Sequence, residues 1–151
     1  PTNYGITQET YDNYRSFCNL EPVNVACIQL YEAKHIYRMF YWDKCQCDKL
    51  PEIYRLAVFD FAVNSGVYES VLWLQRTVTG NCGWIISVDG FMGPDTIRAC
   101  NAYQCGLLRY LKGREIVYRA QNKPQFLKGW MNRLNNLWMA LGNNEKPFSV
   151  E

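Results

Sequence analysis

One acidic residue stands out among the side chains that could take part in chemistry. The segment from Ile53 to Val63 is apolar nearly all round except for Asp60, a pattern typical of a central buried helix. Asn64 follows at i+4, so an amide shares the helical face of the carboxylate. An ionised carboxylate is costly to bury without partners. Asp60 is therefore expected either to pair with an arginine or cap a neighbouring helix, or to line a substrate cleft as a supporting carboxylate.

The single histidine and the cysteines limit which kinds of catalysis the chain can support. His35 is the only histidine and lies between Lys34 and Arg38 in a helical pattern, so an exposed position is expected and Ser-His or Cys-His hydrolysis is disfavoured. The seven cysteines are odd in number, which leaves at least one thiol unpaired within the chain. Cys45 and Cys47 are poorly spaced to bridge each other and make a weak zinc site. We interpret them as free thiols or partners of distant cysteines, and expect no metal and no cofactor.

These groups must be positioned by helices, because apolar residues recur at steps of three and four through most of the chain. Ala26 to Phe40 and Leu127 to Trp138 are two amphipathic examples. Further helices are expected at about 8–18, 51–65, 68–78, 94–104 and 106–121. Only Trp84 to Val88, before the Asp89-Gly90 turn, could form a short extended piece. The sequence therefore predicts an all-α bundle around a central buried helix, with room for one small β-hairpin.

Length and charge set limits on the class of protein. The 151 residues contain no internal repeat and no linker, and they suit one compact unit with a soft boundary near Gly66. A formal charge of +2 is too weakly basic to indicate nucleic-acid binding, although its sign suits an anionic wall polymer. No apolar run approaches the roughly 20 residues that span a bilayer. Pro1 is neither an initiator methionine nor the start of a signal peptide, so an upstream segment is expected.

Two further motifs bear on binding. Asp89-Gly90 makes a tight turn, and Pro94 can then begin the next helix. By itself, this turn before a helix indicates no function. Trp130 and Arg133 are three apart on one helical face, which fits either a stacked Trp-Arg surface or a core tryptophan beside a surface arginine.

The order of these pieces resembles the catalytic module of glycoside hydrolase family 108 followed by a helical peptidoglycan-binding-type region. The first part contains Thr2-Asn3-Tyr4-Gly5-Ile6-Thr7, Ile36-Tyr37 with Tyr41-Trp42, Leu50-Pro51, and Phe59-Asp60 to Asn64-Ser65-Gly66. The second part contains Leu74-Gln75, Val88-Asp89-Gly90 with Gly93-Pro94-Asp95-Thr96, and Lys128-Gly129-Trp130-Met131-Asn132-Arg133. The resemblance implies residues 1–66 as the remainder of the catalytic module and residues 67–151 as the binding-type region, packed together.

Members of this family are lysozyme-like N-acetylmuramidases, common in phages and prophages and sometimes labelled secretion activators. The resemblance implies a lysozyme-like helical fold and an endolysin-type glycosidase that hydrolyses the glycan strand of peptidoglycan by carboxylate acid and base catalysis. It also implies a bacterial or phage origin and action in the periplasm or at the cell wall. Peptidoglycan is then the expected partner.

The family's catalytic glutamate lies in a Glu-Gly-Gly-Tyr-like motif upstream of the Thr-Asn-Tyr-Gly-Ile-Thr segment, and this chain begins just before that segment at Pro1. The general acid is therefore expected outside these residues, and the chain alone is expected to be inactive while the complete protein is an enzyme. Glutamates that lie in polar contexts are expected on solvated faces, and these are Glu9, Glu21, Glu32, Glu52, Glu69 and Glu115.

The substrate-binding candidates follow from the same resemblance and from helical spacing: they are Thr2, Asn3, Tyr4, Thr7, Trp42, Asn64, Trp130 and Arg133. Trp42 could stack on a sugar, although its spacing also fits a core role. The alternative function is a noncatalytic peptidoglycan-binding or secretion-associated module that keeps the fold without the acid. An intracellular helical interaction protein rests on the aromatic composition alone.

Overall fold

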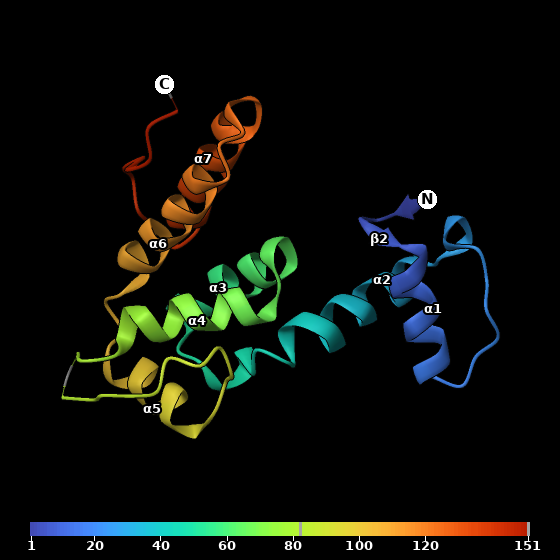
Figure 1. Cartoon of the computed structure of the whole chain (residues 1–151), viewed down its shortest axis with the longest axis horizontal. Coiled ribbons are helices and arrows are strands. Elements are labelled where there is room, and N and C mark those ends of the chain that lie inside the picture. The colour runs from blue at the N-terminus through green and yellow to red at the C-terminus, as the bar shows by residue number, and fades with distance from the viewer. Residues whose placement is uncertain (82, 151) are drawn as a thin grey trace.

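The computed structural model describes residues 1–81 and 83–150, and helices dominate it (Figure 1). The α-helices are α1 (Gln8–Phe17), α2 (Leu30–Tyr37), α3 (Glu52–Ser65), α4 (Val67–Val78), α5 (Pro94–Ala102), α6 (Leu107–Ala120) and α7 (Pro124–Met139). Short 3-10 turns form η1 (Val25–Cys27) and η3 (Cys47–Lys49), and a π-helical turn forms η2 (Arg38–Trp42). The predicted helical class is confirmed, and most helix bounds fall within two residues of the expected ones.

The small β-hairpin lies at the N-terminus, where β1 (Thr2–Asn3) pairs antiparallel with β2 (Ile6–Thr7). Tyr4 and Gly5 connect the strands with φ values of 52° and 76°, the two positive values of a tight hairpin turn. The predicted extended piece at Trp84 to Val88 is wrong, because residues 83–88 contain only a single bridge from Trp84 to Asn81. There the backbone bonds to the end of α4 instead, with Ile86 N donating to the Thr79 hydroxyl at 3.1 Å.

The helix predicted from Ala26 to Phe40 is present, but it begins four residues later than expected, at Leu30. Gln29 is extended, with φ −88° and ψ 152°, and it begins α2 through a capping box in which Glu32 accepts a bond from the Gln29 backbone N–H. The helical period continues beyond Tyr37 but loosens into the π-turn η2. Leu30, expected on the apolar face, is consequently half exposed.

Two groups of buried residues form the interior. The small core is built by β2, α1, η1 and α2, and consists of Ile6, Tyr11, Tyr14, Val25, Ile28, Ala33 and Ile36. The large core begins at Cys45 and extends to Phe148, and in Figure 1 its helices lie away from the α1 and α2 end of the molecule. Helix α3 is the predicted central helix: it packs against α4 and α6 and buries one side almost completely.

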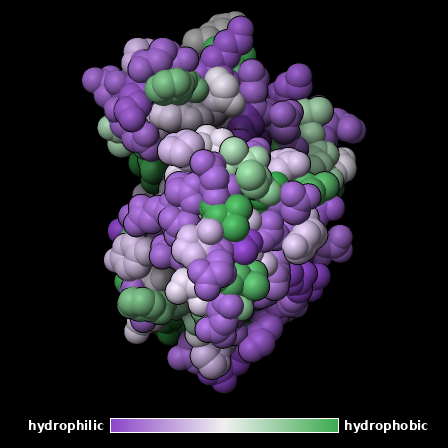
Figure 2. Space-filling view, turned by 90° about the vertical axis from the view of Figure 1, so that its right-hand side faces the viewer, coloured by the Kyte–Doolittle hydropathy of each residue, from purple (hydrophilic) through white to green (hydrophobic). Residues whose placement is uncertain are grey.

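Gly66 separates α3 from α4 with a φ of 93°, a left-handed value that glycine adopts without strain. The division of the chain near this residue stays a prediction, since α3 and α4 pack on each other across it. The face turned toward the viewer in Figure 2 is mainly hydrophilic, with hydrophobic residues in separate small areas. Among the described residues, no helix combines the length and apolarity that crossing a membrane requires.

Gln75 ties the Asp89-Gly90 turn to the neighbouring helices. Its side chain is 1% exposed, and Nε2 donates to Asp89 Oδ1, Phe91 O and Thr96 Oγ1 at 2.9–3.0 Å. Its Oε1 accepts the backbone N–H groups of Asp89 and Gly90 at 3.0 and 2.8 Å. One buried amide thus contacts five polar groups, with its two N–H groups shared among three acceptors, and it fixes the Asp89-Gly90 turn in the loop between α4 and α5.

We predict that Gln75→Leu lowers the free energy of unfolding by about 2–4 kcal/mol, because it leaves several buried polar groups without partners. Urea denaturation followed by circular dichroism measures this. Gln104→Leu is the matched control, since Gln104 is exposed and, within the described residues, its side chain donates one hydrogen bond, to Asn101 O. Equal stabilities of the two variants would show that the Gln75 network does not hold the loop.

Candidate functional site

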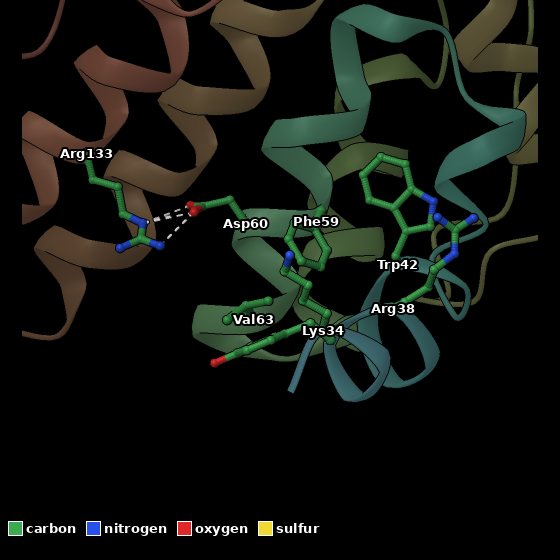
Figure 3. A pocket seen from close by; sticks show the side chains of 8 residues that line it. Lys34, Arg38, Trp42, Phe59, Asp60, Val63 and Arg133 are labelled. Atoms are coloured by element: carbon green, nitrogen blue, oxygen red, sulfur yellow. Dashed lines mark hydrogen bonds and ion pairs between the residues drawn. The ribbon is translucent and has the colours of Figure 1, made fainter. Parts of the chain in front are cut away.

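A pocket of about 560 Å³ opens where α2 and η2 meet α3 and α7 (Figure 3). Its lining comes from four elements that are distant in sequence. The lining residues are Lys34 and Tyr37 of α2, Arg38 and Trp42 of η2, Phe59, Asp60 and Val63 of α3, and Arg133 of α7. The pocket therefore combines aromatic rings, three cations and one carboxylate.

Asp60 sits between two guanidinium groups. Arg133 donates from Nε to both carboxylate oxygens at 3.0 Å and from Nη2 to Oδ1 at 2.7 Å. On its other side, Nη1 of Arg114 lies 2.9 Å from Oδ2 in an ion pair. The side chain of Asp60 is 14% exposed and Arg114 is fully buried. Asp60 thus pairs with arginines, as one of the two alternatives foresaw, and it also lines the pocket, while its role as a supporting carboxylate for substrate stays a prediction.

The electrostatics keep this carboxylate ionised. Burial alone raises the pKa of Asp60, but the hydrogen bonds from Arg133 and the charge of Arg114 outweigh it and leave that pKa below its ordinary value. The same bonds raise the pKa of Arg133. One negative charge between two positive ones leaves the group of Asp60, Arg114 and Arg133, here called the arginine–aspartate cluster, with a net charge of +1.

Buried Arg114 is held by more than its ion pair. Its guanidinium carbon lies 4.8 Å from the centre of the Phe61 ring, and its Nη2 donates to the Tyr118 hydroxyl. Asn64 braces the carboxylate from the same helix, because its Nδ2 donates to Asp60 O at 2.9 Å and to Oδ2 at 3.3 Å. Asn64 itself is exposed and lies beside the pocket rather than in its lining.

The apolar part of the pocket is formed by Tyr37, Trp42, Phe59 and Val63. The rings of Trp42 and Phe59 meet edge to face, with centroids 5.6 Å apart. Trp42 Nε1 donates to Asp48 Oδ1 at 3.0 Å, which fixes the plane of the indole. Trp42 is half-buried, so it packs on α3 with one side and presents the other to the pocket.

The N-terminal hairpin borders the pocket through Tyr37. The Tyr37 hydroxyl donates to Tyr4 O at 2.7 Å, and a Cβ at Gly5 would lie 2.8 Å from that hydroxyl oxygen. Burial, followed by the nearby Tyr41, raises the pKa of Tyr37. Tyr4 thereby approaches the site with its backbone, while about half of its side chain is exposed.

The remaining hairpin candidates have their side chains in other places. Thr7 Oγ1 accepts the Thr10 backbone N–H at 3.2 Å and caps α1. Asn3 Nδ2 donates to Ala26 O at 3.2 Å and ties the hairpin to η1. Thr2 is exposed on β1 opposite Thr7. None of these three side chains is part of the pocket lining.

Trp130 and Arg133 of α7 make different contacts. The Trp130 ring stacks on Tyr118 with centroids 4.8 Å apart and an interplanar angle of 16°, and it also contacts Phe126. Arg133 points toward Asp60 (Figure 3). The arrangement is a tryptophan packed on the core beside a surface arginine, which was one of the two alternatives.

Glu32 is a correction to the expected solvated glutamates. It is 4% exposed, and its oxygens bind Arg15 Nη1 at 3.0 Å, the Tyr11 hydroxyl at 2.9 Å and the Gln29 backbone N–H at 2.9 Å. The carboxylate caps α2 and ties it to α1 within the small core. Its oxygens are thus engaged inside the fold and face away from the pocket lining.

Several pocket residues were not predicted from the sequence. They are Lys34, Tyr37, Arg38, Phe59 and Val63, together with Arg114 behind Asp60. Lys34, Tyr37 and Arg38 are spaced i, i+3 and i+4, so their shared face could have been recognised.

Among the described residues, no cysteine lines this pocket. The cysteines within the described residues are free thiols, with Cys45, Cys47 and Cys100 buried, while Cys82 lies outside those residues. Across residues 1–81 and 83–150, no group of three or more His, Cys, Asp or Glu side chains has the geometry to hold a metal ion.

Two parts of the chain match known protein families, and most of the chain is similar to a solved structure. Residues 1–66 match the family model described as Glycosyl hydrolase 108, and residues 69–135 match the one described as Predicted Peptidoglycan domain. The chain is also similar to a solved structure titled "Structure of Brucella abortus SagA", with 29% identity, a TM-score of 0.66, and coverage of 90% of this chain and 76% of that one. A search of curated proteins gives no match. The chain thus consists of a glycosyl hydrolase 108 domain followed by a predicted peptidoglycan-binding domain.

Proposed function

We propose that this chain belongs to a peptidoglycan hydrolase, an N-acetylmuramidase of the lysozyme-like endolysin type that cleaves the glycan strand of bacterial cell walls. The observation that carries the proposal is the pocket itself, which lies at the junction of the two matched domains. Arg133 of the peptidoglycan domain completes a wall that α2, η2 and α3 of the hydrolase domain begin. Its aromatic rings suit the faces of sugars, and its charged groups suit their polar substituents.

Asp60 supports the reaction in this proposal without donating a proton. A general acid must carry a proton at working pH, and the lowered pKa of Asp60 keeps it ionised. Its lone pairs are engaged by Arg133 and Asn64, so it is poorly placed to act as a base. Asp60 instead fixes the guanidinium of Arg133 at the pocket wall, as a positioning residue.

Glycoside cleavage nevertheless requires a carboxylic acid that protonates the leaving oxygen. Within the described residues, Asp60 is the one carboxylate in the pocket lining. We therefore propose that the acid is supplied from outside residues 1–151, by the glutamate of the Glu-Gly-Gly-Tyr-like motif that the family resemblance implies. The proposed site of action is the periplasm or the cell wall of a bacterium, with a phage or prophage source.

The second candidate is a noncatalytic module that binds peptidoglycan or assists secretion. The same observation favours it, since the one carboxyl group that the described residues place in the pocket lining is Asp60, whose lowered pKa keeps it ionised. In this case residues 67–151 supply wall affinity and the pocket binds glycan without cleaving it. Trp130 then acts by packing α7 rather than by touching sugar.

We predict that a polypeptide of residues 1–151 does not lyse purified walls, while a version that begins at the start of the open reading frame does. Loss of a general acid removes about 10²–10⁴-fold of rate. Turbidity of a wall suspension measures both, with a Glu→Gln variant of any Glu-Gly-Gly-Tyr-like motif as control. Lysis by residues 1–151 at the rate of the longer version would place the acid inside them. Wall binding without lysis by the longer version would favour the noncatalytic module.

We predict that Asp60→Asn lowers the free energy of unfolding by about 3 kcal/mol at pH 7, because it leaves buried Arg114 without its counter-charge. The folded pKa of Asp60 lies below the unfolded value, so this stabilisation is complete above about pH 4 and is lost as the pH falls through the folded pKa. Urea denaturation at pH 7 and pH 3 should therefore show a difference that shrinks in acid.

Asp95→Asn is the control for this measurement. Asp95 pairs with Arg98 on the surface, with both side chains mostly exposed, so the change should stay below about 1 kcal/mol at either pH. A stability of Asp60→Asn equal to that of Asp95→Asn would show that the arginine–aspartate cluster contributes little to the fold.

A further inference from the structure

The three cations of the pocket are not equivalent. Arg38 is matched by two carboxylates, with Nη2 at 2.8 Å from Asp48 and Nε at 3.6 Å from Asp43. Lys34 has no ion pair or hydrogen bond from its ammonium within the part of the chain that the structure describes. Arg38 together with these two carboxylates carries no excess positive charge, whereas Lys34 on α2 is an unmatched cation.

A second unmatched positive charge lies on α7. The arginine–aspartate cluster carries a net charge of +1, and its two arginines differ in access: Arg114 is fully buried while the Arg133 side chain is 47% exposed. Arg133 uses Nε and Nη2 on Asp60, and within residues 1–81 and 83–150 its Nη1 has no hydrogen-bond acceptor. Asp60 thus holds a partly exposed guanidinium in place while the two N–H groups of Nη1 are not used on Asp60, which reduces the entropy lost on binding an anion.

Aromatic side chains lie between these charges. Figure 3 shows Lys34 extending from α2 toward Phe59, with Asp60 and Arg133 on one side and Trp42 on the other. A ligand that fills this space meets ring faces suited to a sugar and, beside them, two cations without full counter-charge. A neutral sugar would leave these two cations without a counter-charge.

We propose that this pocket binds a carboxylate attached to the glycan, with Lys34 and Arg133 as the residues that determine this specificity. The chain then selects muramyl strands, which carry acids, over neutral polymers of N-acetylglucosamine. This inference rests on the proposed function, because it names the chemical class of glycan that the same pocket takes. The carboxylate can belong to the lactyl group of muramic acid or to a peptide stem attached to it.

Isothermal titration of the full chain with soluble glycans tests this. The probes are a tetrasaccharide of alternating N-acetylglucosamine and N-acetylmuramic acid with free lactyl carboxylates, the same sugar with carboxamides, and the chitin tetrasaccharide. A fourth probe with peptide stems on the lactyl groups distinguishes the two sources of carboxylate. We expect the carboxylate form to bind about tenfold more tightly than the carboxamide, with a preference that declines as salt is added.

Variants of Lys34 and Arg133 test whether these residues cause the preference for the carboxylate glycan. Lys34→Gln and Arg133→Gln should each remove most of it, and Lys34→Arg should retain it because the charge is kept. Lys34 is exposed, so its variants should fold as the natural chain does, which circular dichroism checks. Lys128→Gln is the matched control, because Lys128 is exposed on α7 outside the pocket lining and should leave the preference unchanged.

The outcomes separate this inference from the proposed function. Equal affinity for the carboxylate and carboxamide sugars would overturn the inference and leave the pocket as a glycan site. A preference for the carboxylate that survives both Lys34→Gln and Arg133→Gln would overturn the assignment to these residues. Binding of none of the four glycans, together with absence of wall binding and lysis by the open-reading-frame version, would overturn the proposed function as well.

Discussion

The ion pairing of Asp60 with Arg114 and Arg133 is the constraint on which the rest of the structure depends. A guanidinium with no solvent exposure, such as that of Arg114, is tolerated only beside a counter-charge. Asp60 supplies it from α3, and Arg133 reaches the same carboxylate from α7. Asp60 and Arg133 are 73 positions apart in the sequence, so their ion pair fixes α7 against α3. This packing of the two helices forms the wall of the pocket.

The two matched domains are consequently not independent in space. Helix α3 lies within residues 1–66, yet it packs in the large core against α4 and α6 of the region that follows. The rest of the first domain forms the small core, and α2 continues through η2 toward α3. The π-turn of η2 places both Arg38 and Trp42 in the pocket lining, and such turns occur often at functional sites.

The helices could be predicted from the sequence because apolar spacing is a local property. The errors lie where polar side chains bind the backbone: the capping box of Gln29 and Glu32 starts α2 later than the apolar spacing predicts, and Ile86 N donates to the Thr79 hydroxyl where a strand was expected. For Asp60 the sequence left two alternatives, a structural ion pair or cap and a place in a substrate cleft, since an acid in an apolar helix needs a partner. Its partner could have been inferred, because Arg114 occupies a core-facing position in α6, but no local pattern identifies Arg133.

The position of the arginine–aspartate cluster helps to explain why charged residues, rather than apolar ones, occupy this place. A buried ion pair adds little stability over an apolar replacement of the same volume, because both charges must lose their water. Gln75 shows that this chain can brace a loop with a neutral amide that keeps every bond internal. The arginine–aspartate cluster differs in that one arginine remains open to solvent at the edge of a pocket. A cluster built only for packing would gain nothing from that exposure, whereas a cluster that presents a fixed cation to a ligand requires it.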